Sequence, residues 1–142
     1  MNENIMKKWI FLISIIFAFN SCTVGDEPDR SFFLLPVDQV EMPSSYILGN
    51  ISKIKVKYRR PTDCYIFNGF NVAYDAQNHL SRTVAIQAVR LNNSNCLPDT
   101  ESLFEIELDF KPTVAGVYTF KFWLGADANG VDQYETHEVE IL

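Results

Sequence analysis

The sequence predicts an all-β fold, a seven-stranded antiparallel β-sandwich over residues 34–142. Three observations lead to this prediction. Apolar and polar side chains alternate through most of the region, as they do in strands with one buried and one solvated face. No segment of the region shows the apolar period of a helix. Turn residues separate the alternating segments, and short strands spaced in this way within a single domain are typical of a sandwich.

Four segments alternate without interruption, and each is predicted to form one strand. They are residues 53–59, 104–110, 118–124 and 137–141. In the first of them, lysines separate Ile54, Val56 and Tyr58, so the apolar side chains share one face and the charges share the other. Each of these strands therefore has one face for the core and one for solvent.

Three further segments complete the predicted set, namely residues 35–42, 64–74 and 83–91. The first contains Pro36 and is followed by Pro43, which suits a strand at the edge of a sheet. The second is interrupted by Asn68-Gly69, a pair that is compatible with a bulge within one strand or with a two-residue hairpin turn. We favour one strand with a bulge, because each half is short for independent pairing.

The outward positions of the second predicted strand are basic, whereas those of the fifth are acidic. The basic stripe is Lys53, Lys55, Lys57, Arg59 and Arg60. The acidic residues are Glu105, Glu107 and Asp109. We predict that the two strands are neighbours in one sheet, because pairs of opposite charge across the two strands favour this pairing and its register. The stripe is then a neutralised strand face, and a site for an anionic glycan is the less favoured interpretation.

Residues 1–21 have the features of a cleaved signal peptide. Lys7 and Lys8 form a cationic flank, and the apolar run of residues 9–19 is interrupted only by Ser14. Spanning a bilayer takes about 20 apolar residues, so this run is too short for a membrane-spanning helix. We therefore expect the leader to direct export and to be removed.

The end of the leader resembles the lipobox of bacterial lipoproteins, because the small residue Ser21 directly precedes Cys22. Phe19 and Asn20 stand where the lipobox usually has Leu and a small residue. The resemblance implies cleavage before Cys22, attachment of diacylglycerol to its thiol and acylation of the new amino group. An ordinary secretory leader followed by an unmodified cysteine is the alternative.

Residues 22–33 are interpreted as the lipidated Cys22 and a flexible acidic tether. Asp26, Glu27 and Asp29 resemble the short acidic tag that sends lipoproteins of one Gram-negative group to the cell exterior. The resemblance implies a protein anchored in the outer membrane by lipid and facing outward. A solvated tether with no targeting role is the alternative.

Cys64 and Cys96 remain when Cys22 carries the lipid. Cysteines of an exported protein tend to pair in the oxidising compartment that receives it, so a disulfide between them is predicted. The alternative is a metal site, but two isolated cysteines without a nearby histidine do not supply the four ligands of zinc. We expect neither a metal nor a cofactor.

The segment from Pro112 to Tyr118 resembles the approach to strand F of immunoglobulin-like domains, where a tyrosine forms the tyrosine corner. The resemblance gives that role to Tyr118 and implies an immunoglobulin-like strand order. The chain departs from antibody domains because Phe120 stands at the position of the second core cysteine and strand C contains no tryptophan. The resemblance therefore implies a bacterial immunoglobulin-like sandwich without the antibody core disulfide.

Trp123 is the leading candidate for contact with a partner. Alternation places it on the opposite face from Phe120, hence outward, beside Lys121. An outward indole can stack on a sugar ring or on a partner protein, and Tyr134 is a third candidate contact. The alternative is a tryptophan that covers the outer edge of the sheet or packs under the tether.

No pattern in the sequence indicates catalysis, metal binding or nucleic-acid binding. Asp127, Asn129 and Asp132 lack the spacing of an EF-hand, and His79 and His137 have no companion at ligand spacing. Residues 22–142 hold 10 Lys+Arg and 17 Asp+Glu, and this acidic balance disfavours a phosphate backbone as a partner.

We therefore expect a non-enzymatic, lipid-anchored module of the cell envelope that binds a protein or a glycan. Its partners are the membrane, through Cys22, and one unidentified protein or glycan. A structural accessory subunit of an outer-membrane complex is the first alternative, since an unpaired sandwich edge can exchange strands with a partner. A small hydrolase is the second and less favoured alternative.

Overall fold

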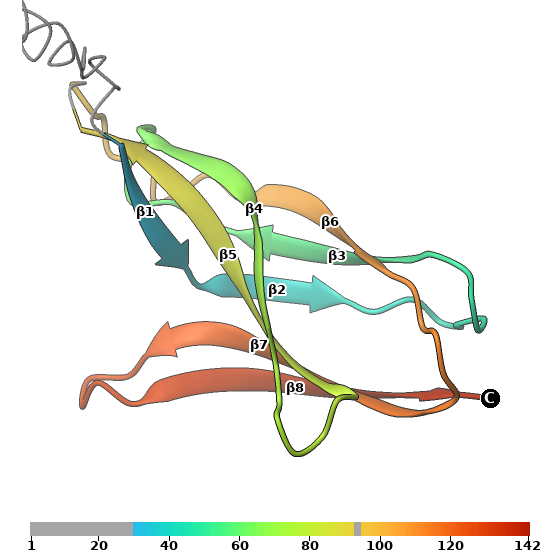
Figure 1. Cartoon of the computed structure of the whole chain (residues 1–142). Coiled ribbons are helices and arrows are strands. Elements are labelled where there is room, and N and C mark those ends of the chain that lie inside the picture. The colour runs from blue at the N-terminus through green and yellow to red at the C-terminus, as the bar shows by residue number, and fades with distance from the viewer. Residues whose placement is uncertain (1–29, 93–94) are drawn as a thin grey trace, which may run out of the picture.

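The computed structural model describes residues 30–92 and 95–142 (Figure 1). The predicted signal peptide (1–21), Cys22 and the acidic residues of the tether lie outside these ranges. The regular elements of the described residues are eight strands. They are β1 (Arg30–Leu35), β2 (Val37–Glu41), β3 (Ser52–Tyr58), β4 (Tyr65–Tyr74), β5 (Ser81–Leu91), β6 (Phe104–Phe110), β7 (Gly116–Ala126) and β8 (Asp132–Ile141). The described part of the chain contains no helix that is long and apolar enough to cross a membrane.

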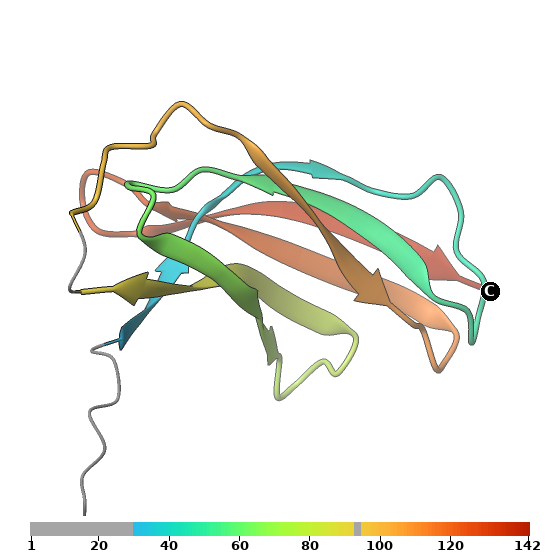
Figure 2. The same cartoon turned by 90° about the horizontal axis from the view of Figure 1, so that it is seen from above.

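The strands form two sheets, which confirms the predicted all-β fold. Sheet A has five strands in the order β1-β5-β7-β8, with β4 also paired to β5. Sheet B has three strands in the order β2-β3-β6. Figure 1 shows sheet B above the hairpin of β7 and β8, and in Figure 2 β3 and β6 cross over that hairpin. The core lies between these two layers.

The predicted single strand over residues 35–42 is wrong, because the chain forms two strands here and eight in total rather than seven. β1 ends at Leu35 in sheet A, and β2 begins at Val37 in sheet B. Pro36 lies between them, where the chain passes from sheet A to sheet B, and it has no N–H to donate to a ladder. β1 begins at Arg30 and thus overlaps the end of the segment interpreted as a tether.

The predicted purely antiparallel pairing is also wrong, since β5 and β7 are parallel over Ser81–Val84. β4 pairs with β5 from Arg82 to Arg90. β1 pairs with β5 over Ile86–Leu91. A strand has two edges, so β1 and β7 share the second edge of β5, one at each end. Alternation assigns each side chain to a face but does not give a strand its direction, which is why the parallel pair is not visible in the pattern.

The interpretation of Asn68-Gly69 as a bulge is confirmed. β4 is a single strand, and its pairing with β5 shifts register between Phe67 and Gly69. Gly69 has φ +119°, a conformation that residues with a Cβ rarely adopt, so the glycine permits the bulge.

The predicted pairing of the basic and acidic strands is confirmed, because β3 and β6 are antiparallel neighbours. Lys55 faces Glu107 in the register, and Lys53 Nζ lies 2.6 Å from a Glu107 carboxylate oxygen. Glu41 in β2 joins the network at 2.9 Å from Lys57 Nζ. Their hydrogen bond lowers the pKa of Glu41 and raises the pKa of Lys57. The lysines of the stripe therefore have acidic neighbours within the protein.

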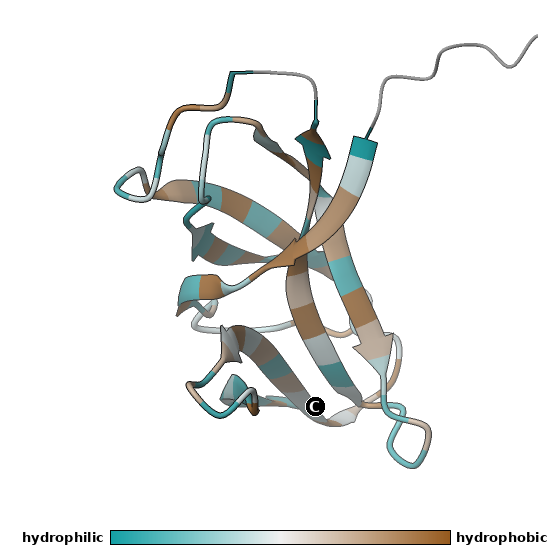
Figure 3. Cartoon of the chain, turned by 90° about the vertical axis from the view of Figure 1, so that its left-hand side faces the viewer, coloured by the Kyte–Doolittle hydropathy of each residue, from teal (hydrophilic) through white to brown (hydrophobic). Residues whose placement is uncertain are grey.

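Aromatic rings join the two layers in the core. Phe110, from β6 in sheet B, packs edge-on against Tyr118 at 5.0 Å and against Phe120 at 4.9 Å between ring centroids. Both partners belong to β7 in sheet A, and all three side chains are 4% exposed or less. Figure 3 shows hydrophobic and hydrophilic residues alternating along the strands. This alternation gives the sandwich its buried interior and its outer faces.

Candidate functional site

A hollow of about 280 Å³ lies on the outer face of sheet A. The lining residues are Leu34, Asn71, Thr83, Ala85, Trp123, Asp132 and Tyr134, and they come from all five strands of the sheet. The face is the outer one because the neighbours of Thr83 and Trp123 in sequence, Val84 and Phe122, are fully buried in the core. Two of the predicted contact residues, Trp123 and Tyr134, thus lie in one concave site.

The strand pairing explains why these residues meet. Trp123 and Tyr134 are opposite one another in the β7–β8 ladder, so they share a face. Thr83 and Lys121 are partners in the parallel β5–β7 ladder, and Lys121 lies on the same face but does not line the hollow. β5 then leaves β7 and continues along β1, which brings Leu34 to the site.

A bulge shapes β7 directly after Trp123. The β7–β8 register shifts between Trp123 and Gly125, and Gly125 has φ +95°. A Cβ on Gly125 would lie at an ordinary van der Waals distance of 3.5 Å from Pro36 Cβ, so the positive φ, and not the approach of the β1–β2 connection, favours glycine here. Bulges are frequent beside active sites because they re-aim neighbouring side chains.

The indole of Trp123 is positioned by a hydrogen bond. Trp123 Nε1 donates to an Asp132 carboxylate oxygen at 2.9 Å. The Trp123 side chain is partly buried, and Tyr134 is 43% exposed. Because the indole N–H already has an acceptor, the apolar ring is the part of Trp123 that remains for a ligand.

A second hollow, of about 210 Å³, adjoins the first. Its lining residues are Phe32, Phe33, Leu34, Asn71 and Gln87. Leu34 and Asn71 line both hollows, so the two form one continuous depression, which we call the outer groove. Phe32 is 66% exposed at one end of the outer groove, and Trp123 and Tyr134 lie at the other.

The lining of the outer groove is mainly apolar, with a few polar groups. It combines aromatic and aliphatic side chains with amide, hydroxyl and carboxylate groups, and includes no histidine, cysteine, lysine or arginine. A sugar ring has C–H groups on its faces and hydroxyl groups on its rim, and apolar rings edged by a few polar groups match both.

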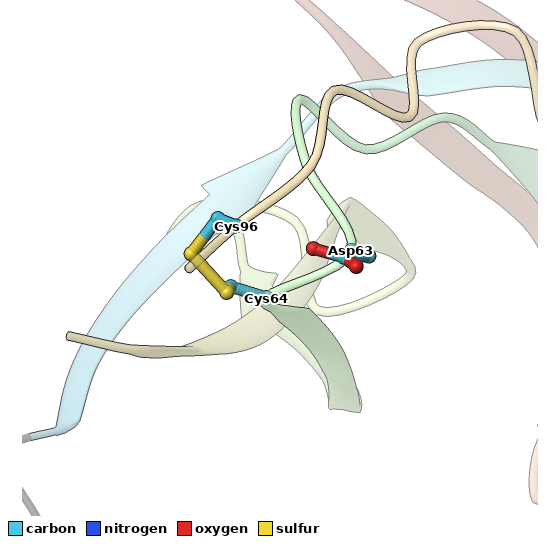
Figure 4. A group of neighbouring side chains, drawn as sticks. All are labelled: Asp63, Cys64 and Cys96. Atoms are coloured by element: carbon cyan, nitrogen blue, oxygen red, sulfur yellow. A yellow bond between two sulfur atoms is a disulfide. The ribbon is translucent and has the colours of Figure 1, made fainter. Parts of the chain in front are cut away.

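The predicted disulfide is confirmed, with the sulfur atoms of Cys64 and Cys96 2.06 Å apart. Figure 4 shows this bond beside Asp63. These residues form the one cluster of three potential metal ligands in the described ranges, but both sulfur atoms belong to the disulfide and neither is a thiolate. The Asp63 carboxylate accepts a hydrogen bond from the Leu97 N–H at 2.9 Å. The cluster therefore ties the β5–β6 connection to the start of β4.

Tyr118 makes the contacts that a tyrosine corner requires. Its side chain is 1% exposed, and its hydroxyl donates to the Val114 carbonyl at 3.0 Å. The Val114 N–H donates to the same hydroxyl oxygen at 3.4 Å. A tyrosine corner is defined by such hydrogen bonds to backbone a few residues upstream. They tie the β6–β7 connection to β7.

Asp127 in the β7–β8 loop and Asp132 at the start of β8 have separate partners within the protein. Asp127 Oδ1 accepts the N–H groups of Asn129 at 2.8 Å and Val131 at 3.0 Å. The Asp132 carboxylate instead accepts the Trp123 indole. Asp127 thus shapes the turn, and Asp132 positions the tryptophan.

Both histidines lie away from the outer groove. His79 is exposed in the β4–β5 connection. His137 Nε2 lies 2.7 Å from Glu135 Oε1, and its ring packs edge-on against Phe122 at 5.9 Å between centroids. His137 also lines a hollow of about 320 Å³ that contains Tyr46, and burial raises the pKa of Tyr46 to about 12. His137 is therefore engaged in packing and in pairing with Glu135.

Sequence reasoning identified Trp123 and Tyr134 but missed Leu34, Asn71 and Thr83. Alternation alone puts Asn71 and Thr83 on the outward face, so a signal for them is present in the sequence. Leu34 has no such signal, because it depends on β1 pairing with β5.

Comparison of the chain with protein-family models, curated proteins and solved structures found no match. The functional assignment therefore rests on the sequence and on the geometry of the outer groove.

Proposed function

We propose that this protein is a non-enzymatic glycan-binding module of the cell envelope, with the outer groove as its binding site. The observation that carries the proposal is that Trp123 and Tyr134 lie opposite one another in a hollow edged by Asn71, Thr83 and Asp132. Aromatic residues in a concave site, with a small number of placed polar groups, are the usual composition of a site for a small ligand.

The charge of the protein favours a neutral glycan. The chain has a formal net charge of −6, and the lining of the outer groove contains Asp132 but no lysine or arginine. Both the negative net charge of the chain and the Asp132 carboxylate would repel an acidic sugar. The amide groups of Asn71 and Gln87 and the hydroxyl of Thr83 can each donate to and accept from sugar hydroxyl groups.

The Trp123→Ala substitution is expected to weaken glycan binding by about tenfold or more, because a buried aromatic anchor contributes much of the affinity of a binding site. The measurement begins with the full chain, in mild detergent, on an array of neutral glycans. Titration calorimetry with the strongest binder then compares the wild type with the variant.

Val117→Ala is the matched control for this experiment. Val117 is 48% exposed, and it lies on the same strand and the same face as Trp123, at the other end of β7. We expect the Val117→Ala variant to bind the glycan with the affinity of the wild type. Equal affinity of the Trp123→Ala variant and the wild type would refute stacking on the indole. Absence of glycan binding, together with one stoichiometric protein co-purifying from detergent extracts, would favour the accessory-subunit alternative.

The proposed location of the module is the outer membrane, with the protein anchored through lipid on Cys22 and facing the cell exterior. The order of a cationic flank, a short apolar run, Ser21 and Cys22 supports this proposal, as do the acidic residues Asp26 and Glu27. Several acyl chains on one residue give stable anchoring, since each buried CH₂ contributes about 0.8 kcal/mol.

Labelled palmitate is expected to enter the wild-type protein and not the Cys22→Ala variant. Protease added to intact cells is expected to degrade the wild type, because the domain faces outward. Labelling of the variant would refute the anchor at Cys22. Protection of the wild type from protease until the outer membrane is broken would refute the outward orientation. It would not bear on the lipid anchor, which the palmitate labelling tests.

We further propose that the sandwich is a variant of the immunoglobulin-like fold. The hydrogen bonds of Tyr118 and the order β2-β3-β6, which corresponds to strands A, B and E, support this proposal. The variation lies in the neighbour of β7, the strand that contains Tyr118 and corresponds to strand F. In immunoglobulin-like domains strand C is the neighbour of strand F, whereas here β5 pairs with β7 and runs parallel to it.

A further inference from the structure

A separate pocket of about 150 Å³ opens between the two sheets. It lies where β4, an edge strand of sheet A, faces β6, an edge strand of sheet B. Its apolar walls include Val72, Val84 and Leu108, and its charged residues are Arg82, Lys111 and Asp109. This is the open side of the sandwich, where core residues come within reach of a ligand.

Arg82 is surrounded by aromatic rings in this pocket. Its guanidinium carbon lies 4.9 Å from the ring centroids of both Phe110 and Tyr118. The rings of Tyr74, at 5.4 Å, and Phe120, at 5.7 Å, are further neighbours. Ring contacts of this kind stabilise the positive charge of the guanidinium, whose side chain is only partly buried.

The hydrogen-bonding capacity of Arg82 is not used up by these rings. The N–H donors of a guanidinium lie in its plane, and they need oxygen acceptors that an aromatic face does not supply. Arg82 Nη1 is buried and has no hydrogen-bond partner among the described residues. Asp109, the carboxylate at the pocket, has its oxygen 3.4 Å from Lys53 Nζ. Two cations and one carboxylate that is already paired make the pocket locally positive.

We propose that this pocket binds the carboxylate group of a small organic acid with a short apolar tail. The planar carboxylate accepts hydrogen bonds from the fork of the Arg82 guanidinium, and Lys111 adds a second positive charge. The tail packs against Val72, Val84 and Leu108. The pocket, at about 150 Å³, is smaller than either hollow of the outer groove, at about 280 and 210 Å³, so a carboxylate with a few carbon atoms suits it better than a chain of sugars.

This site is distinct from the outer groove. Val72, Arg82 and Val84 point into the sandwich, whereas their neighbours Asn71 and Thr83 line the outer groove on the opposite face of the same strands. The two sites therefore take different ligands and can be tested separately.

The test is a titration of the full chain, in mild detergent, with butyrate and with butyramide, followed by two-dimensional NMR of the backbone amides. The two probes have the same shape, but only butyrate carries a charge. We expect saturable shifts with butyrate at the amides around Arg82 and Phe110, and no saturable shifts with butyramide at the same ionic strength. The Arg82→Met variant, which keeps the length of the side chain, is expected to bind butyrate at least about tenfold more weakly.

Arg90→Met is the matched control. Arg90 lies on the same strand and face as Arg82, and its Nε likewise has no partner among the described residues, but it does not line the pocket. Binding of butyrate is expected to be unchanged in this variant and in Trp123→Ala, so the result is independent of the glycan proposal. Should Arg82→Met fail to fold, Arg82→Lys keeps the charge, loses the fork and is expected to bind more weakly.

Three outcomes would overturn the proposal. The first is the absence of saturable butyrate shifts in the wild type. The second is equal shifts with butyrate and butyramide, which would leave only a hydrophobic pocket. The third is a butyrate affinity that neither substitution of Arg82 changes.

Discussion

The Phe110→Ala substitution is expected to lower the free energy of unfolding by about 3–5 kcal/mol, as large-to-small changes of buried phenylalanines do. Phe110 is 4% exposed and is the ring through which sheet B meets β7 of sheet A. Its removal leaves Tyr118 and Phe120 without their edge-on partner and opens a cavity between the layers. It also takes away one of the rings that lie beside Arg82. Urea unfolding of the wild type and the variant measures the difference.

Phe32→Ala is the control for the loss of an aromatic ring. Phe32 is 66% exposed in β1, so we expect its substitution to change the free energy of unfolding by no more than about 0.5 kcal/mol. A Phe110→Ala variant as stable as the Phe32→Ala variant would contradict the central place of Phe110 in the core.

The double substitution Cys64→Ala and Cys96→Ala is expected to lower the free energy of unfolding by about 3–4 kcal/mol. The disulfide spans a sequence separation of 32, and a cross-link over such a loop restricts the unfolded chain. In the folded protein it ties the long β5–β6 connection to the start of β4. The Asp63 N–H also donates to the Leu97 carbonyl at 3.0 Å, so hydrogen bonds retain part of this connection after the bond is lost.

Comparison of urea unfolding under oxidising and reducing conditions checks this prediction. Reductant is expected to bring the wild type to the stability of the double variant, and to leave the double variant unchanged. A wild type whose stability does not respond to reductant, although free thiols are detected, would contradict a stabilising role for the disulfide.

The sequence predicted the strands that have one buried and one solvated face, because burial imposes a period of two on a strand. β3 and β6 are the clearest examples, since their charges also predicted that the two strands are neighbours, and the structure pairs Lys55 with Glu107. The disulfide was predictable for a different reason: after Cys22 was assigned to the lipid, only Cys64 and Cys96 remained.

The division of the first predicted strand was not predictable from alternation. In the sequence, Pro36 favours an edge strand, but in the structure it is the residue at which the chain passes from sheet A to sheet B. A proline without an N–H is compatible with either role. The choice depends on whether a partner strand is available on each side, which is a property of the assembled fold.

The candidate site likewise combines features that the sequence predicts with features that depend on the assembled fold. Alternation determined that Trp123 points outward, and the aromatic side chain made it a candidate contact. Only the tertiary structure decided that Trp123 and Tyr134 lie in a hollow, because the hollow forms where β5 leaves β7 and β1 takes its place. For strands with one buried face, alternation in the sequence therefore predicts which side chains face the core and which face solvent. The tertiary structure decided which solvent-facing residues meet, because strand neighbours and directions depend on contacts between distant segments that leave no local pattern.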